Sequence, residues 1–333
     1  MHTLPQQREE WIHTPLWQRG AGGISSQLFP LTTARVARYR PPSCGDPVKL
    51  SPALTSYLQV APMLVVLLLF FGVPLMVVIA FSFFDFDGIN TVPSFVWTNY
   101  QELFASKVTL SLYLKTIYYA VTVWAITLVI GFTVAYFLAF HVRSLIWQMA
   151  LFLLCTVPFW TSNIIRMISW IPFLGRNGIF NQALMGAGLT HEPLEFLLFS
   201  DFAVITAYVH LFTLFMIVPI FNSMARIDRS IIEAAWDGGS SAWRIIWDIV
   251  VPLSKTGIAL GSIFVITLVM GDFFVVKVMS GSHSASVAMA MSNQIAMVQY
   301  PPAAASAVVL LVIVSLMVAA ILQIVDVRKE LTR

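Results

Sequence analysis

The chain consists of long apolar runs separated by shorter polar stretches. Six runs reach the roughly 20 residues that an α-helix needs to cross the hydrocarbon of a bilayer, with few or no charges. They cover residues 57–84, 116–140, 145–170, 202–221, 257–276 and 303–325. None alternates between apolar and polar positions, as the strands of a membrane barrel do. The pattern therefore predicts an all-α integral membrane protein, a helical bundle with six spans.

Composition supports a membrane protein and excludes several other classes. Of the 333 residues, 58% are hydrophobic and only 11% are charged, whereas a soluble domain carries about a quarter charged residues. The net charge of +3 is spread thinly over the chain and does not form a nucleic-acid footprint. The two cysteines, Cys44 and Cys155, provide neither a disulfide framework nor a CxxC metal spacing. We expect no nucleic-acid partner and no bound metal.

The Lys and Arg residues are divided unequally between the two sides of the predicted bundle. Fourteen lie on the side of both termini and four on the other, while Arg166 lies inside a span and is not counted. The fourteen are Arg8, Arg19, Arg35, Arg38, Arg40, Lys49, Arg143, Arg226, Arg229, Arg244, Lys255, Arg328, Lys329 and Arg333; the four are Lys107, Lys115, Arg176 and Lys277. Because cytoplasmic loops carry the excess of positive charge, both termini are expected to be cytoplasmic.

This orientation gives a simple organisation of the chain. Residues 1–56 form a cytoplasmic tail, 57–110 the first span with a periplasmic loop, 111–326 the main transmembrane domain and 327–333 a second cytoplasmic tail. Residues 1–50 contain no continuous apolar core after a basic start, so we expect no cleavable signal peptide. The loops at 85–115 and 173–201 are placed outside and are long enough to receive a partner.

The cytoplasmic loop at 226–253 has an internal pattern. Its first part, 230–236, is compatible with a short helix, and the serines after Gly238 and Gly239 are suited to cap a second helix. In that second helix an apolar stripe recurs at helical spacing, made of Ile245, Ile246, Ile249 and Val250. The glycine pair permits a sharp bend between the two helices. The loop is therefore predicted to be a stiff projection with a small face at Ala234 and Ala235.

At these residues the sequence resembles the EAA loop of permease subunits of binding-protein-dependent ABC importers. The family pattern is Glu-Ala-Ala, three residues, Gly, nine residues, Ile, one residue, Leu-Pro. The matching residues are Glu233, Ala234, Ala235, Gly239, Ile249 and Pro252, and Val251 replaces the usual leucine. Within the family, the segments at 157–161 and 175–178 look most like spermidine/putrescine-type permeases.

The resemblance implies a type I importer fold and a division of labour among subunits. A periplasmic binding protein would deliver a solute to two permeases, here expected to be different chains, in the bacterial inner (cytoplasmic) membrane. Two copies of a cytoplasmic ATPase would dock on the EAA loops and hold ATP and Mg²⁺, since this chain has no GxxxxGK[ST] loop and is not expected to be an enzyme. The solute would be a polyamine or related cationic amine, with an opine or amino-acid derivative as the alternative.

Charged and polar residues inside the predicted spans are candidates for the substrate pathway, because burying them in a bilayer is costly. Asp272 in the fifth span can compensate a cationic solute, or it can form an internal ion pair with Arg166 in the third. His210 in the fourth span is expected to be a hydrogen-bonded packing residue rather than a proton relay.

Four residues of the third span follow one another at spacings of 3, 4 and 3. They are Trp160, Asn163, Met167 and Trp170, and on one continuous helix they share a face. Trp160, Asn163 and Trp170 would line a passage, the tryptophans offering cation–π faces, or the stripe would serve helix packing. In the fifth span, Gly257 and Gly261 form a GxxxG spacing that favours a close helix contact.

Two other functions fit a membrane protein of this size less well than an importer permease does. An ion-driven secondary transporter often contains internal repeats and clustered ionisable residues, and the two halves of this chain show no obvious similarity to each other. An intramembrane enzyme would need a motif such as GxSxG or HExxH, and neither occurs in the sequence.

Overall fold

The computed structural model describes residues 52–88, 90–281 and 284–324. The tail predicted over residues 1–56 lies outside the described residues up to residue 51, together with Cys44, and the tail predicted over 327–333 lies outside them entirely. The chain divides into two compact units, Met1–Gln59 and Val60–Arg333. Of the first unit, the described part is the beginning of helix α1 (Pro52–Leu67). The remaining elements belong to the second unit.

Five helical runs are long and apolar enough to cross a membrane within the described part of the chain. They are Ser56–Phe81, Lys107–His141, Asp201–Met224, Ala242–Gly271 and Tyr300–Gln323. A sixth candidate is a bent pair, Leu145–Trp160 followed by Asn163–Gly186, with 87° between its two parts. Counted as one span, the pair completes the predicted six-span helical bundle.

The first part of the second unit contains a small hairpin between two helical segments. α1 is followed by a π-helical turn, η1 (Leu68–Gly72), and by α2 (Val73–Phe81). Strands β1 (Asp85–Phe86) and β2 (Thr91–Val92) pair in antiparallel fashion, and α3 (Thr98–Ala105) follows them. The Asn99 side chain donates hydrogen bonds to the carbonyl oxygens of Ser82 (3.0 Å) and Phe84 (2.8 Å), so it attaches α3 to the end of α2.

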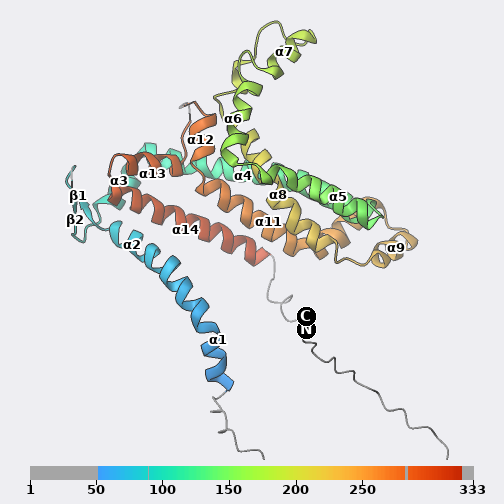
Figure 1. Cartoon of the computed structure of the whole chain (residues 1–333), viewed down its shortest axis with the longest axis horizontal. Coiled ribbons are helices and arrows are strands. Elements are labelled where there is room, and N and C mark those ends of the chain that lie inside the picture. Colours follow the sequence, from blue (N-terminus) through green and yellow to red (C-terminus); the bar gives the residue numbers. More distant parts are fainter. Residues whose placement is uncertain (1–51, 89, 282–283, 325–333) are drawn as a thin grey trace, which may run out of the picture. The chain divides into compact units, whose positions relative to one another are not determined.

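Three helices form the centre of the second unit: α4 (Lys107–Tyr136), α8 (Asp201–Met224) and α11 (Val251–Gly271). Each packs against the other two, and Figure 1 shows them side by side. At Gly257 the helices α8 and α11 approach so closely that an added Cβ would lie 2.4 Å from the Pro219 carbonyl oxygen. The predicted GxxxG contact is therefore confirmed, and its partner is α8.

The third span is not the continuous helix that hydropathy predicts over 145–170. α5 (Leu145–Thr156) runs into a short 3₁₀ turn, η3 (Val157–Trp160), and α6 (Asn163–Leu174) then starts in a new direction, as Figure 1 shows. Pro158 lies in the 3₁₀ turn, and Ser162 caps the new helix by accepting a hydrogen bond from the Ile164 amide (3.3 Å). A second start signal so soon after a proline favours two helices over one.

The fifth span also differs from the run predicted over 257–276. Its helix ends at Gly271, and the backbone of Asp272 is extended (φ −86°, ψ 129°) before the short helix α12 (Phe274–Met279). Asp272 therefore lies at a break after the span and not inside it.

The other elements connect these helices. They are the π-helical turn η2 (Phe137–His141), α7 (Ile179–Gly186), the 3₁₀ turn η4 (Glu195–Leu197), α9 (Arg229–Asp237), α10 (Ala242–Ile245), the π-helical turn η5 (Ile246–Val250), α13 (Val287–Ala296) and α14 (Tyr300–Ile324). α14, which contains the sixth span, packs against α13, α2 and α11.

Candidate functional site

The loop predicted to be a stiff projection, here termed the coupling loop (residues 226–253), starts with a capped helix. Asp228 accepts a hydrogen bond from the Ser230 amide (3.0 Å) at the start of α9, and hydrogen bonds with Ser230 hold the pKa of this carboxyl below its usual value. The Arg229 guanidinium donates to the carbonyl oxygens of Ala139 and Val142, both at 3.1 Å. The helix is thereby attached to the end of the second span.

The bend between the two helices of the coupling loop is formed at Gly239. Its φ of +78° is a left-handed conformation that glycine adopts without steric cost. The amides of Gly239 and Ser240 donate to the carbonyl oxygens of Trp236 (2.9 Å) and Ala235 (3.0 Å), closing the end of α9. Ser241 then caps the next helix by accepting from the Arg244 amide (3.4 Å). The predicted helix, bend and helix are confirmed.

The second helix of the coupling loop continues without a break into the fifth span. The run Ala242–Gly271 therefore begins earlier than the span predicted from residue 257. Pro252 does not interrupt it, since the π-helical turn η5 widens the helix immediately before the proline. Ile249 lies within this turn. The second helix of the coupling loop and the fifth span are therefore one continuous helical run.

The exposed face of the coupling loop combines small and aromatic side chains. Glu233 and Ala234 are exposed, while Ala235 is half-buried and packs on the hydrophobic core. Sequence reasoning missed three exposed tryptophans, Trp236 (53% exposed), Trp243 (69%) and Trp247 (53%). The rings of Trp243 and Trp247 meet edge to face at 5.7 Å. Three tryptophans within twelve residues of a loop are typical of a surface that contacts another protein, and this pattern can be seen in the sequence.

The predicted face of Trp160, Asn163, Met167 and Trp170 does not exist as one face of one helix. Trp160 lies in η3, before the break, and is 77% exposed. Asn163 begins α6 and is exposed, whereas Met167 is fully buried. Periodicity grouped the four residues only because it assumed a continuous helix.

Trp170 is hydrogen-bonded instead to the fourth span. Its indole Nε1 donates to Nδ1 of His210 at 3.2 Å, and the two rings meet edge to face. His210 is therefore hydrogen-bonded, as expected, but it is exposed and not packed in the interior of this chain. On the same helix as Trp170, the Arg166 guanidinium donates to the Asn163 side-chain oxygen and lies 5.6 Å from the centre of the Phe159 ring.

The alternative ion pair between Asp272 and Arg166 does not form; among the described residues, the ion pairs involve neither side chain. Asp272 Oδ1 accepts hydrogen bonds from the Val275 amide (2.8 Å) and from the Tyr208 hydroxyl (3.3 Å). The carboxylate thus caps α12 and connects this short helix to α8. The residue is half-buried.

A partly buried polar cluster near the start of α8 was not predicted from the sequence. The Tyr119 hydroxyl donates to Asp201 Oδ1 (2.5 Å) and also contacts the Ser284 hydroxyl (2.5 Å). Lys115 lies 3.2 Å from the same Asp201 oxygen. The members come from α4, α8 and the segment before α13, and nothing in the sequence indicates that they meet.

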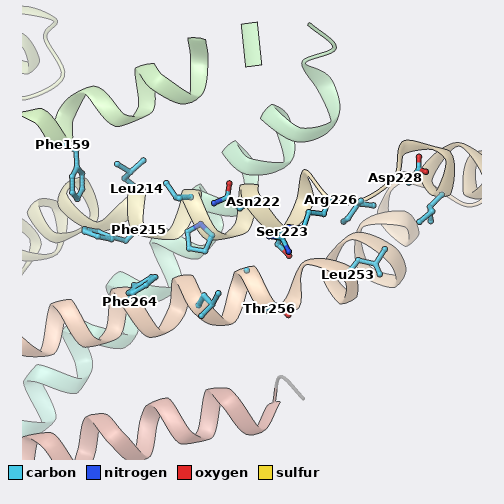
Figure 2. Close-up of a pocket in the computed structure, with 16 residues that line it drawn as sticks. Phe159, Leu214, Phe215, Asn222, Ser223, Arg226, Asp228, Leu253, Thr256 and Phe264 are labelled. Atoms are coloured by element: carbon cyan, nitrogen blue, oxygen red, sulfur yellow. The ribbon is translucent and has the colours of Figure 1, made fainter. Parts of the chain in front are cut away.

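Between α8 and α11 lies a groove of about 890 Å³ that extends to the coupling loop. Figure 2 shows Phe159, Phe215 and Phe264 at one end, and Arg226 and Asp228 toward the other. The side chains between them include Asn222, Ser223 and Thr256. None of the predicted pathway residues, Asp272, Trp160, Asn163 and Trp170, is among those that line it.

Comparison with known proteins identifies several bacterial relatives. The chain is 32% identical over 232 residues to the spermidine/putrescine transport system permease protein PotB of Escherichia coli, covering 68% of this chain and 82% of the relative. It is 29% identical to PotB of Haemophilus influenzae over 68% of this chain and 79% of the relative. The osmoprotective compounds uptake permease protein GgtC of Synechocystis is 24% identical over 70% and 84%. No protein-family model matches the sequence.

The fold is also found among solved structures. A chain of the bacterial alginate ABC transporter, crystallised with an alginate pentasaccharide-bound periplasmic protein, superposes with a TM-score of 0.63 at 15% identity, covering 80% of this chain and 92% of that chain. The superposition shows that the helical bundle has the type I importer fold, and the similarity to PotB shows that the chain is an importer permease subunit. The chain belongs to the family of ABC-transporter permeases that includes PotB.

Proposed function

We propose that this permease moves a polyamine, spermidine or putrescine, into the cell. The observation that carries the proposal is its similarity to PotB chains, at 29–32% identity over about four fifths of their length. An osmoprotective compound is the second candidate, because GgtC is similar over a comparable share of its length.

Transport would be driven from the coupling loop by a separate ATPase. Glu233, Ala234, Ala235, Gly239, Ile249 and Pro252 would form or shape the docking surface, and the ATPase would hold ATP and Mg²⁺, with no cofactor in this chain. The continuous run Ala242–Gly271 supports this proposal, because a rigid helix transmits a push on its cytoplasmic end into the membrane. The tethering of α9 by Arg229 supports it as well.

The complete transporter would contain this chain, a second and different permease, two copies of the ATPase and a periplasmic binding protein. Trp160 and Asn163 are exposed and would face the passage between the permeases, with Trp170 beside them and Asp272 attracting the ammonium group of the solute. The assignment of Asp272 is compatible with its partial exposure, and its hydrogen bonds to Val275 and Tyr208 would hold the carboxylate in position.

Purification in mild detergent tests the proposed assembly. The tagged chain should retain an ATPase, a second permease and, in the presence of putrescine, a binding protein, all identified by mass spectrometry. A chain that purifies alone and still catalyses uptake driven by an ion gradient would contradict the proposal.

We also propose that both termini are cytoplasmic and that the segment at 173–201 is periplasmic, from the distribution of Lys and Arg. Single cysteines placed in a chain lacking Cys44 and Cys155 test this orientation. Leu189→Cys, at a position 72% exposed, should react with an impermeant reagent in intact cells, and Ser240→Cys should not. The reverse pattern would refute the orientation.

A further inference from the structure

One cavity outside the coupling loop has an unusual composition. It has a volume of about 370 Å³, lies between α6 and α8, and is lined by Thr161, Ile165, Arg166, Ser169, Trp170, Phe173 and His210. One lining residue carries a permanent positive charge, and none is an Asp or Glu. We term it the Arg166 pocket.

Arg166 is incompletely paired within the described part of this chain. The residue is only 8% exposed, and its Nε has no hydrogen-bond partner. One terminal nitrogen donates to Asn163, a neutral group, and the guanidinium stacks near Phe159. A buried guanidinium without a carboxylate is strongly unfavourable, so this arrangement indicates that a negative partner comes from outside the described part of the chain.

The remaining polar groups of the pocket favour an anion over a cation. Because His210 Nδ1 accepts from Trp170, the neutral imidazole carries its proton on Nε2, which is then a donor. The hydroxyls of Thr161 and Ser169 already donate to the carbonyl oxygens of Pro158 and Ile165, both at 2.8 Å. The donors left for a ligand are therefore Arg166 and His210, which suit the two oxygens of a carboxylate.

The depth of the pocket limits the source of that anion. His210 is nine residues into the 24-residue helix α8. At 1.5 Å per residue it lies about 14 Å from one end of the helix and about 21 Å from the other. With α8 crossing the bilayer, this places His210 within the hydrocarbon layer of about 30 Å. Phosphate groups of lipids stay near the surfaces of the bilayer and do not reach this level. This depth favours a solute in the passage or a neighbouring protein chain as the source of the anion.

We propose that the Arg166 pocket is a carboxylate-binding site at mid-membrane depth. The carboxylate is either the acidic side chain of the second permease or the carboxylate of an amino-acid-like solute, and Arg166 and His210 recognise both in the same way. This inference rests on the proposed function, since it needs a second permease or a passage beside α6. A polyamine has no carboxylate, so with a polyamine as solute the pocket is filled by the second permease.

The test compares Arg166→Gln and Arg166→Lys with Arg176→Gln as the control, since Arg176 forms an exposed ion pair with Glu195. Each variant is expressed with the ATPase, second permease and binding protein that co-purify with the unmodified chain. Three quantities are measured: accumulation of this chain expressed alone, the amount of second permease that co-purifies, and uptake into proteoliposomes of putrescine and of 4-aminobutanoate. These two probes share a four-carbon chain and an ammonium group, and only the second has a carboxylate.

We expect Arg166→Gln to accumulate normally when expressed alone, because it removes an unpaired buried charge. A loss of co-purified second permease of about tenfold or more, milder in Arg166→Lys, would identify a protein carboxylate. An intact complex that loses uptake of 4-aminobutanoate alone would identify a solute carboxylate.

Two results would overturn the proposal. In one, Arg166→Gln matches the Arg176→Gln control in assembly and in uptake of both probes. In the other, Arg166→Gln or Arg166→Lys prevents accumulation of the chain expressed alone, which would mean that Arg166 serves the folding of this chain. Failure of the proposed function is seen separately, because the unmodified chain would then lack a second permease and putrescine uptake.

Discussion

The Arg229 side chain donates a hydrogen bond to the carbonyl oxygen of Ala139, 90 residues earlier in the chain, at 3.1 Å. Ala139 lies in η2, where the second span ends, and Arg229 begins the first helix of the coupling loop. The bond fixes the coupling loop to the end of the second span, in addition to its covalent links to the fourth and fifth spans. We expect a movement of the loop to reach the second span through this bond.

Arg229→Met should weaken this transmission. A hydrogen bond to a charged group contributes about 1.5–3 kcal/mol, so its loss lowers the population of the tethered loop by about tenfold or more. Uptake should fall while the ATPase remains bound and hydrolyses ATP. Both activities are measured on the same preparation of reconstituted transporter. Arg143→Met, at an exposed position close to Ala139 in the chain, is the control. Normal coupling in Arg229→Met would contradict this role.

The bend at Gly239 should be sensitive to backbone conformation and not to side-chain volume. An added Cβ meets nothing within 4 Å, but the φ of +78° costs an ordinary residue about 1–2 kcal/mol. Gly239→Val should reduce ATPase binding and uptake, and Gly239→Asn should do so less, because asparagine tolerates this conformation. Equal effects of the two substitutions would show that the bend is not the cause. Gly186→Ala, in open space on α7, serves as control.

Alanine substitutions of the two glycines at the contact between α8 and α11 should destabilise the chain to different extents. A Cβ at Gly257 would lie 2.4 Å from a backbone oxygen, that of Pro219, whereas one at Gly261 would first meet the flexible Met216 side chain at 2.7 Å. Gly257→Ala should destabilise the chain by about 1–3 kcal/mol, and Gly261→Ala by less. The midpoint of thermal unfolding in detergent measures the difference. The opposite order would contradict the observed packing.

Asp272→Asn separates charge from helix capping. The amide oxygen can still accept from Val275 and Tyr208, so α12 should remain in place, while the negative charge is lost. We expect putrescine uptake to fall by about tenfold or more, with normal complex assembly and normal capture by the binding protein. Tyr208→Phe keeps the carboxylate and should retain more uptake. Unchanged uptake in Asp272→Asn would restrict Asp272 to a structural role.

The sequence was sufficient for much of the fold. Hydropathy located the spans because a helix in lipid must be apolar over its whole length, and the serines and Gly239 located the helices of the coupling loop through local backbone chemistry. Both signals depend only on residues close together in the chain. Pro158 marked the region where the third span breaks. Hydropathy averaged along the chain contains no information on direction, so it did not reveal the bend of 87°.

The contacts between distant segments were not predictable in this way. Tyr119 and Asp201 are 82 residues apart, and Trp170 and His210 are 40 apart, so their hydrogen bonds follow from how the helices pack. Asp272 was assigned to a span because the residues on both sides of it are apolar. A helix end at Gly271 followed by a capping aspartate was a local signal that hydropathy concealed.

The most direct test of the central claim is uptake of radiolabelled putrescine into proteoliposomes that contain the complete transporter and its binding protein. The account predicts accumulation that requires ATP on the side of the coupling loop, is inhibited by unlabelled spermidine and is abolished by Gly239→Val with the spans still inserted. Uptake that proceeds without ATP, or an ATP-driven transporter that moves an osmoprotectant and ignores both polyamines, would contradict it.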